Sequence, residues 1–197
     1  IVSTTGIDPN LIDDVVWGCV TQAGEQTGDI ARTAALSAGL PESVTGVTVD
    51  RQCGSSQQAL HFVAAGVASG QYDIAIAGGV ESMSRNPMFS SSMGKSPYGT
   101  KFKDRYPGDD LNQGIGAEMI AEKWGFSRTE LDEFAVRSHE LAAAATDAGA
   151  FESQIIPVET ENGTVSVDEG IRRGGSVEKL AKLQTVFKAV SYTHLTL

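Results

Sequence analysis

The hydrophobic and polar positions in the first half of the chain predict strands that alternate with helices. Residues 14–20, 47–49 and 73–77 are rich in apolar and β-branched side chains, which is typical of short buried strands. Residues 30–38 and 59–68 lie between these strands and carry apolar side chains at helical spacing. Because strands and helices alternate, we expect an α/β fold with a mostly parallel sheet flanked by helices.

From Arg85 onward the composition changes, and the chain is expected to alternate between loops and helices. Proline, glycine and serine are frequent in 86–106, which predicts a loop-like segment. The other predicted elements are helices at 114–124, at 128–148 and from Ser176 to Leu183, and a strand pair at 155–159 and 164–167 joined by Asn162-Gly163.

Several polar residues are suited to begin these helices. Asp29 is expected to cap the helix at 30–38 with its side chain, and Ser176 to cap the last helix. Ser127 and Glu130 have the spacing of a capping box. The buried stripe of the helix that follows is expected to consist of Leu131, Phe134, Ala135, Ser138, Leu141, Ala142 and Ala145.

Cys53 lies between a predicted strand and a predicted helix. Gly54 is expected to supply the unusual backbone angles of a tight turn, and Ser55 or Ser56 to cap the helix. The positive end of a helix dipole favours a thiolate, and free amides of the same turn could bind an oxyanion. This setting suits a cysteine that attacks a carbonyl, although many free cysteines are only small buried hydrophobic residues, and the pattern alone leaves both open.

The second cysteine, Cys19, is expected to be a packing residue within its strand. Two cysteines provide neither a disulfide framework nor metal-ligand spacing, so no metal is expected. This usage indicates a reducing compartment, and we expect a cytoplasmic protein.

The charge of the chain bears on its partners. The net charge of −10 argues against nucleic acid or an anionic membrane as a general partner. Residues 52–72 contain no Lys, Arg, Asp or Glu. Their serine, glutamine, histidine and glycine side chains favour a core helix over a membrane span.

Two motifs resemble the thiolase family, the acetyl-CoA acyltransferases. The first is the run Asp-Arg-Gln-Cys-Gly-Ser-Ser at 50–56, and the second is the run at 71–84 that ends Gly-Gly-Val-Glu-Ser-Met-Ser. The resemblance extends from Asp13 to Lys188. It implies a thiolase-like layered fold with a mixed, mostly parallel sheet flanked by helices and an inserted loop domain.

The resemblance also implies a division into domains. Residues 1–84 correspond to the N-terminal half-domain, without its first strand and helix, so the N-terminus is expected to be truncated. Residues 85–188 correspond to the loop domain, which covers the active site and holds coenzyme A (CoA) in the family. Residues 189–197 do not match the family.

In the family, an acyl group passes between a 3-ketoacyl-CoA and CoA through a cysteine. The resemblance makes Cys53 this nucleophile, with its backbone amide contributing to the oxyanion hole. The family's catalytic histidine, second cysteine and asparagine belong to the C-terminal half. His61, interpreted as a core or interface residue, His139, expected to be solvated or half-buried, and His194 do not lie in a matching motif, so we expect this chain to be inactive alone.

The resemblance places Arg172 and Phe187 at positions that contact the nucleotide end of CoA. An arginine can bind phosphate and a ring can stack on adenine, but Arg172 can equally be a solvated surface residue. Asn112-Gln113 stands where acetyl-specific members often carry His-Met beside the acyl pocket, and this favours a longer or bulkier acyl group. CoA would be a substrate and no other cofactor is expected; the full-length protein would be a homo-dimer or homo-tetramer.

Two other functions remain open at this point. The fold could bind acyl-CoA or lipid without reacting, or Cys53 could be a peroxide-sensitive thiol. In the second case only Cys19 could serve as the resolving cysteine.

Overall fold

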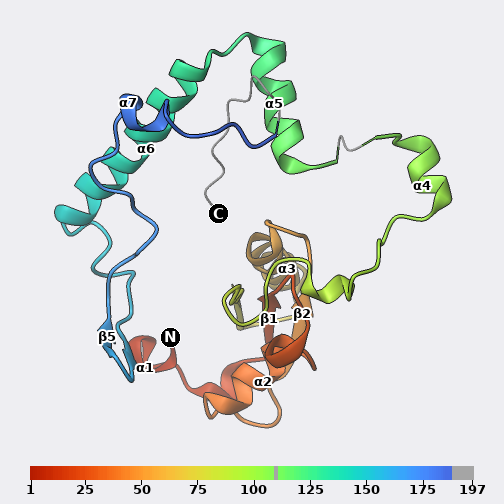
Figure 1. The fold of residues 1–197 in the computed structure, drawn as a ribbon. Helices are drawn as coiled ribbons and strands as arrows, with labels where there is room; N and C mark the ends of the chain where they lie inside the picture. Colours follow the sequence, from red (N-terminus) through yellow and green to blue (C-terminus); the bar gives the residue numbers. More distant parts are fainter. Residues whose placement is uncertain (109–110, 188–197) are drawn as a thin grey trace. The chain divides into compact units, whose positions relative to one another are not determined.

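A computed structural model describes residues 1–108 and 111–187 of the 197-residue chain (Figure 1). The chain divides into two compact units, one of residues Ile1–Tyr98 and one that begins at Gly99. The proposed start of a loop domain at residue 85 and the tail at 189–197 remain predictions, and the tail lies outside the described residues.

The first unit is built on a parallel sheet with strand order β2-β1-β3. The central strand β1 (Asp14–Gly18) pairs in parallel with β2 (Thr45–Val49) and with β3 (Ala75–Gly79). The parallel arrangement predicted from the sequence is therefore confirmed. The helices and turns of this unit are α1 (Val2–Thr5), η1 (Pro9–Leu11), η2 (Gly24–Gln26), α2 (Ile30–Ser37), α3 (Ser55–Ser69) and η3 (Ser90–Ser92).

The helices α2 and α3 pack on opposite faces of the central strand. Val15 is buried in a cluster with Ala31 of α2, whereas the next residue, Val16, is buried with Ala59 of α3. Successive side chains of a strand point to opposite faces of the sheet. β1 is therefore covered on both sides, which explains why its sequence is almost continuously apolar.

The neighbouring strand β2 is less buried than predicted. Val47 is 42% exposed, and β2 is an edge strand of the described sheet. In β3, Gly78 and Gly79 lie within the strand, so this strand extends two residues beyond its predicted end at residue 77.

The second unit consists mainly of helices. The predicted helices at 114–124 and 128–148 are confirmed, and α7 is shorter than expected. The segment 86–106, which belongs partly to each unit, is mostly irregular but contains two short helical elements that the sequence did not predict, η3 and, at Thr100–Arg105, α4. The elements of this unit are α4 (Thr100–Arg105), α5 (Gln113–Trp124), α6 (Arg128–Asp147), β4 (Val158–Thr160), β5 (Gly163–Val165) and α7 (Val177–Leu180).

Two of the predicted helix caps are confirmed. The Ser127 hydroxyl accepts a hydrogen bond from the Glu130 amide at 3.3 Å, and the Ser127 amide donates to the Glu130 carboxylate at 2.7 Å. Ser176 accepts from the amide of Lys179 at 3.3 Å. These bonds engage backbone amides at the starts of α6 and α7, where the regular helical bonding pattern leaves amides without acceptors.

The predicted cap at Asp29 is wrong in its chemistry. Asp29 occupies the capping position of α2 but makes no side-chain bond to the helix. Instead, the Thr48 hydroxyl of β2 accepts from the Ala31 amide at 3.2 Å and donates to Asp29 Oδ1 at 2.7 Å. The hydroxyl of Thr48, from a neighbouring strand, therefore caps α2 in place of the predicted Asp29 carboxylate.

The buried stripe predicted for α6 is also wrong in part. Phe134 and Leu141 are 71% and 60% exposed. The packed face carries Asp132, which binds Arg128 Nε at 2.9 Å, and Arg128 also donates to the Leu180 carbonyl of α7 at 2.6 Å. Phe134 lies two residues after Asp132 and so, at 100° per residue, on nearly the opposite side of the helix.

The short hairpin forms, but its turn is shifted from the predicted position. β4 and β5 are antiparallel, and Thr160 pairs with Gly163. The two-residue loop is therefore Glu161-Asn162 rather than Asn162-Gly163. Gly163 has a φ of 110°, a conformation that glycine tolerates and other residues rarely adopt.

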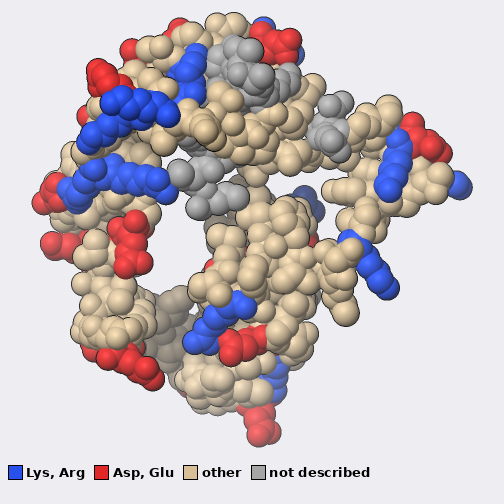
Figure 2. Space-filling view, viewed as in Figure 1, with Lys and Arg blue, Asp and Glu red and all other residues tan. Residues whose placement is uncertain are grey.

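Charged side chains of both signs lie among one another on the face shown in Figure 2. Binding of a polyanionic ligand by a chain of net charge −10 would therefore depend on local groups rather than on a broad basic surface. Within residues 1–108 and 111–187, no helix combines the length and the apolar composition needed to cross a bilayer.

Candidate active site

The candidate site lies at the edge of the sheet where the parallel strands end. The chain leaves β1 toward α2 on one face and leaves β2 toward α3 on the other. In open α/β sheets, ligands bind where neighbouring strands send their connections to opposite faces. Cys53 lies in the connection from β2 to α3, at this position.

The turn that carries Cys53 is closed by its own backbone. The Gly54 amide donates to the Arg51 carbonyl at 3.1 Å, and the Ser55 amide donates to the Gln52 carbonyl at 3.0 Å. Because these two amides are engaged within the turn, they are not free to bind an oxyanion. The Cys53 amide remains the predicted contributor.

The expectation that Gly54 supplies an unusual backbone conformation is wrong. Its φ is −96°, which any residue can adopt. The left-handed residue is Gln52, with a φ of 49°. The Asp50 carboxylate accepts from the Gln52 amide at 2.7 Å, so an aspartate side chain stabilises the turn two residues before Cys53.

The expected capping role of Ser55 or Ser56 is also wrong. Gly54 is the capping residue of α3 and has no side-chain bond. The Ser55 hydroxyl accepts from the Arg51 amide at 2.9 Å and donates to the Gln52 carbonyl at 2.6 Å. Ser55 therefore braces the turn instead of the helix.

The two cysteines have opposite environments. Cys53 is a free, exposed thiol two residues before α3, so within the described residues it is not a small buried hydrophobic residue. Cys19 is only 1% exposed, and its amide donates to the Val49 carbonyl at 3.0 Å. Burial, with smaller contributions from the charges of Glu81 and Asp50, raises the pKa of the Cys19 thiol.

Two glycines allow α3 to begin very close to the sheet. A side chain at Gly18 would overlap the peptide between Ser55 and Ser56, and one at Gly79 would overlap the Ser56 side chain. These glycines therefore set how closely the Cys53 turn approaches β1 and β3. The interpretation of the sequence missed their role, although a glycine inside a strand is itself a signal of close backbone approach.

Glu81 joins the ends of β1 and β3. Its carboxylate accepts from the amides of Val20 at 2.7 Å and Thr21 at 3.2 Å, and from the Gln26 side chain at 3.3 Å. Gln26 is buried and also accepts from the Ser82 amide at 2.7 Å. Desolvation by burial would raise the pKa of Glu81, but these hydrogen bonds together hold it below its usual value.

The sequence contains only an indirect signal of this cluster, because Glu81 comes shortly after the apolar strand and its two glycines. A carboxylate next to a buried strand needs hydrogen-bond donors, and the backbone amides at the end of a neighbouring strand can supply them.

In the second unit, the structure brings Phe187 and the start of α5 together. The Phe187 ring is half-buried and lies against Gly114, where a side chain would overlap it. Gln113 is the exposed first residue of α5, and Asn112 caps the helix by accepting from the Gly114 amide at 2.9 Å.

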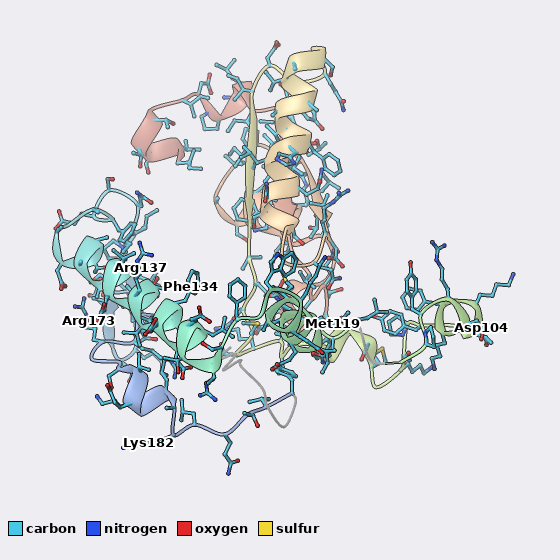
Figure 3. All side chains as sticks on the ribbon, turned by 90° about the horizontal axis from the view of Figure 1, so that it is seen from above. Asp104, Met119, Phe134, Arg137, Arg173 and Lys182 are labelled. Atoms are coloured by element: carbon cyan, nitrogen blue, oxygen red, sulfur yellow. The ribbon has the colours of Figure 1, made fainter. Side chains whose placement is uncertain are left out.

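Arg172 lies elsewhere in this unit, beside α6. It is exposed, and its backbone amide donates to His139 Nδ1 at 3.2 Å. The adjacent Arg173 forms a two-pronged ion pair with Asp147, with both N–O distances at 2.8 Å (Figure 3). Of the two neighbouring arginines, Arg173 therefore binds the end of α6 while the Arg172 side chain is exposed.

The histidines agree only in part with expectation. His61 is exposed on α3, so it is not a core residue of the described chain. His139 is half-buried, as expected. His194 lies outside the described residues.

Known proteins resemble this chain over almost its whole length. The model of the thiolase N-terminal domain matches residues 1–194, a range that extends past both ends of the motif-based match at 13–188. A steroid 3-ketoacyl-CoA thiolase, FadA6, of Mycobacterium tuberculosis is 47% identical over 93% of this chain and 47% of its own length. A probable acetyl-CoA acyltransferase of Staphylococcus aureus is 40% identical over 95% of this chain and 51% of its own length.

A solved structure agrees with these relatives. The crystal structure of the Bacillus anthracis acetyl-CoA acetyltransferase aligns with a TM-score of 0.77 and 33% identity, over 97% of this chain and 51% of that chain. The chain thus spans about half the length of the relatives it matches. The family match, the relatives and the shared α/β fold together show that this chain belongs to the thiolase family.

Proposed function

We propose that this chain is the part of a thiolase acyltransferase that carries the acyl-accepting nucleophile, Cys53. The observation that carries the proposal is an exposed thiol on a braced turn, between the end of a parallel strand and the start of a 15-residue helix. Relatives named as 3-ketoacyl-CoA thiolases and an acetyl-CoA acyltransferase support this reaction class.

In the proposed reaction, the Cys53 thiolate attacks the ketone carbon of a 3-ketoacyl-CoA. The new S–C bond forms as the C–C bond to the acetyl-CoA portion breaks, and the departing carbanion equivalent takes up a proton to become acetyl-CoA. The thiol of a second CoA then attacks the acyl-cysteine, giving a shortened acyl-CoA and free Cys53. The reverse sequence forms a carbon–carbon bond.

Two features of the first unit favour the anionic species of this reaction. The dipole of α3 has its positive end beside Cys53 and would stabilise the thiolate. The Cys53 backbone amide is proposed to donate to the developing oxyanion, because the neighbouring amides of Gly54 and Ser55 are already engaged. The acid and base that move protons are assigned to residues outside this chain, so we expect no thiolysis from the 197-residue chain alone.

CoA and acyl-CoA thioesters are the proposed partners, with no metal and no further cofactor. The exposed Arg172 guanidinium is proposed to bind a phosphate of CoA, since Arg173 is engaged by Asp147. The half-buried Phe187 ring is proposed to stack on adenine with the face that does not contact Gly114. We propose a cytoplasmic homo-dimer or homo-tetramer for the full-length protein.

The acyl group is proposed to be longer or bulkier than acetyl. Asn112 has a structural role as the cap of α5, so its presence carries less information about the substrate than Gln113, which is exposed at the proposed acyl site. The name of the M. tuberculosis relative, a steroid 3-ketoacyl-CoA thiolase, is in keeping with a bulky substrate.

The proposal is tested by incubating the 197-residue chain with acetyl-CoA and measuring its intact mass. We expect one acetyl group per chain in the wild type and in Cys19→Ala, and none in Cys53→Ala. Cys19→Ala is the matched control because that thiol is buried. Equal labelling of Cys53→Ala and the wild type would overturn the assignment, and rapid thiolysis by the chain alone would show that the acid and base groups were misplaced.

The two rival functions give different results in the same experiment. A protein that only binds acyl-CoA would retain acetyl-CoA without a change in mass. A peroxide sensor would form a disulfide between Cys53 and Cys19, but Cys19 is 1% exposed, which disfavours it as a resolving thiol.

A further inference from the structure

The Ser55 hydroxyl is a buried polar group that touches the chain on the other side of Cys53. Ser55 is 5% exposed. Its hydroxyl accepts from the Arg51 amide at 2.9 Å and donates to the Gln52 carbonyl at 2.6 Å. One side chain thus uses both its donor and its acceptor on the two residues that precede Cys53.

We propose that Ser55 is a positioning residue that holds the Cys53 turn in the conformation needed for reaction. The catalytic role of Cys53 itself rests on the proposed function. The positioning role rests on the hydrogen bonds of the described chain and can be tested without any acyl-CoA.

The turn needs this support because its backbone conformation is uncommon. Gln52 adopts a φ of 49°, which is disfavoured for residues other than glycine. The Asp50 carboxylate stabilises this residue from one side by accepting from its amide at 2.7 Å. Ser55 binds its carbonyl from the other side, so the left-handed residue is held at both its amide and its carbonyl.

Ser55 is itself held in place by the sheet. The peptide between Ser55 and Ser56 lies directly against Gly18 of β1, where a side chain would overlap it. The hydroxyl is therefore attached to a point that cannot move toward the sheet. The two hydrogen bonds of this hydroxyl therefore fix the position of the Cys53 turn relative to β1 and to the start of α3.

The test measures the rate at which iodoacetamide alkylates Cys53 as a function of pH. The variants are Ser55→Ala and, as a matched control, Ser56→Ala, which removes the hydroxyl at the next position of the same helix, where it lies against Gly79 of β3. The rate of Cys53→Ala is subtracted to remove any reaction at Cys19. Circular dichroism checks that each variant retains its secondary structure.

For Ser55→Ala we expect a rate at neutral pH that is lower by about threefold or more and a pH profile that differs from that of the wild type, because the turn that presents the thiol loses both hydrogen bonds of the Ser55 hydroxyl. Ser56→Ala should match the wild type. Superimposable profiles of Ser55→Ala and the wild type would overturn the proposal. Because iodoacetamide reports on the thiol alone, a failure of acetyl-CoA labelling would refute the proposed function without affecting this result.

A second measurement does not depend on the folding of a variant. In the wild type, hydrogen exchange of the Arg51 amide should be slow, because this amide donates a hydrogen bond to the buried Ser55 hydroxyl. Exchange of this amide at the rate of an exposed loop amide would overturn the proposal.

Discussion

Glu81 accepts hydrogen bonds from the backbone amides of Val20 and Thr21, which follow β1. These bonds favour its charged form and outweigh desolvation, so its pKa is lowered in the folded chain. The unfolded chain therefore takes up a proton on Glu81 more readily than the folded chain. The stabilisation is fully present above the unfolded pKa and is lost as the pH falls through the lowered folded pKa.

We predict that Glu81→Gln lowers the free energy of unfolding at neutral pH by about 1 kcal/mol, because a neutral amide oxygen is a weaker acceptor than a carboxylate and the site is partly solvated. The difference from the wild type should shrink as the pH falls below 4.5, the ordinary value for glutamate. Urea unfolding at several pH values measures both effects.

The matched control is Glu42→Gln, a change of the same kind at an exposed position. It should leave the free energy of unfolding nearly unchanged. If Glu81→Gln were as stable as this control at neutral pH, the hydrogen bonds of Glu81 would not contribute to stability.

At the level of single residues, the sequence indicated Cys53 but not the groups that hold it. A strand, a turn and a helix can be predicted from the spacing of apolar residues, so the exposed thiol before α3 could be anticipated. The left-handed residue is Gln52 rather than Gly54. That choice depends on hydrogen bonds from Asp50 and Ser55, which hydrophobic spacing does not encode.

The start of α3 is fixed by its close contact with β1. The backbone of Ser55 and Ser56 lies where a side chain at Gly18 would be. Backbone atoms cannot rotate away as a flexible side chain can, so the helix itself would have to shift.

We predict that Gly18→Ala lowers the free energy of unfolding by about 2 kcal/mol through overpacking. It should also change the rate at which iodoacetamide modifies Cys53, because α3 begins two residues after the thiol. Urea unfolding and the alkylation assay measure these two effects.

Gly116→Ala is a control for which the expected change in the free energy of unfolding has the opposite sign. Gly116 lies inside α5, and among the described residues no heavy atom beyond its chain neighbours and the backbone of its own helix lies within 4 Å of an added Cβ, so alanine should stabilise the helix by about 0.5–1 kcal/mol. If both substitutions had the same effect, the contact at Gly18 could not be what limits the approach of α3.

At the level of helices and strands, local patterns predicted that an element forms better than they predicted which residues pack or cap it. Ser127 and Glu130 are close in sequence, and their capping box is present. The cap of α2 comes from Thr48, which is distant in sequence from Asp29, so no local rule could find it. On α6, periodicity identified a stripe, but the side facing α7 is set by the bonds of Arg128.

For the molecule as a whole, the motifs gave the family and the α/β class, and the match to the thiolase N-terminal domain over residues 1–194 confirms the family. Substrate and assembly are not encoded in a comparable local pattern. The chain spans about half the length of the relatives that it matches, so its substrate and its assembly stay proposals.

The acyl-cysteine is the central claim, and peptide mapping after acetyl-CoA treatment tests it most directly. Trypsin cleaves after Arg51 and Arg85, and the peptide between them contains Cys53 but not Cys19. Neutral hydroxylamine cleaves a thioester but leaves an acetylated lysine intact. We predict an acetyl group on this peptide that hydroxylamine removes. Acetyl groups confined to lysine-containing peptides and stable to hydroxylamine, with Cys53 unmodified, would contradict the claim.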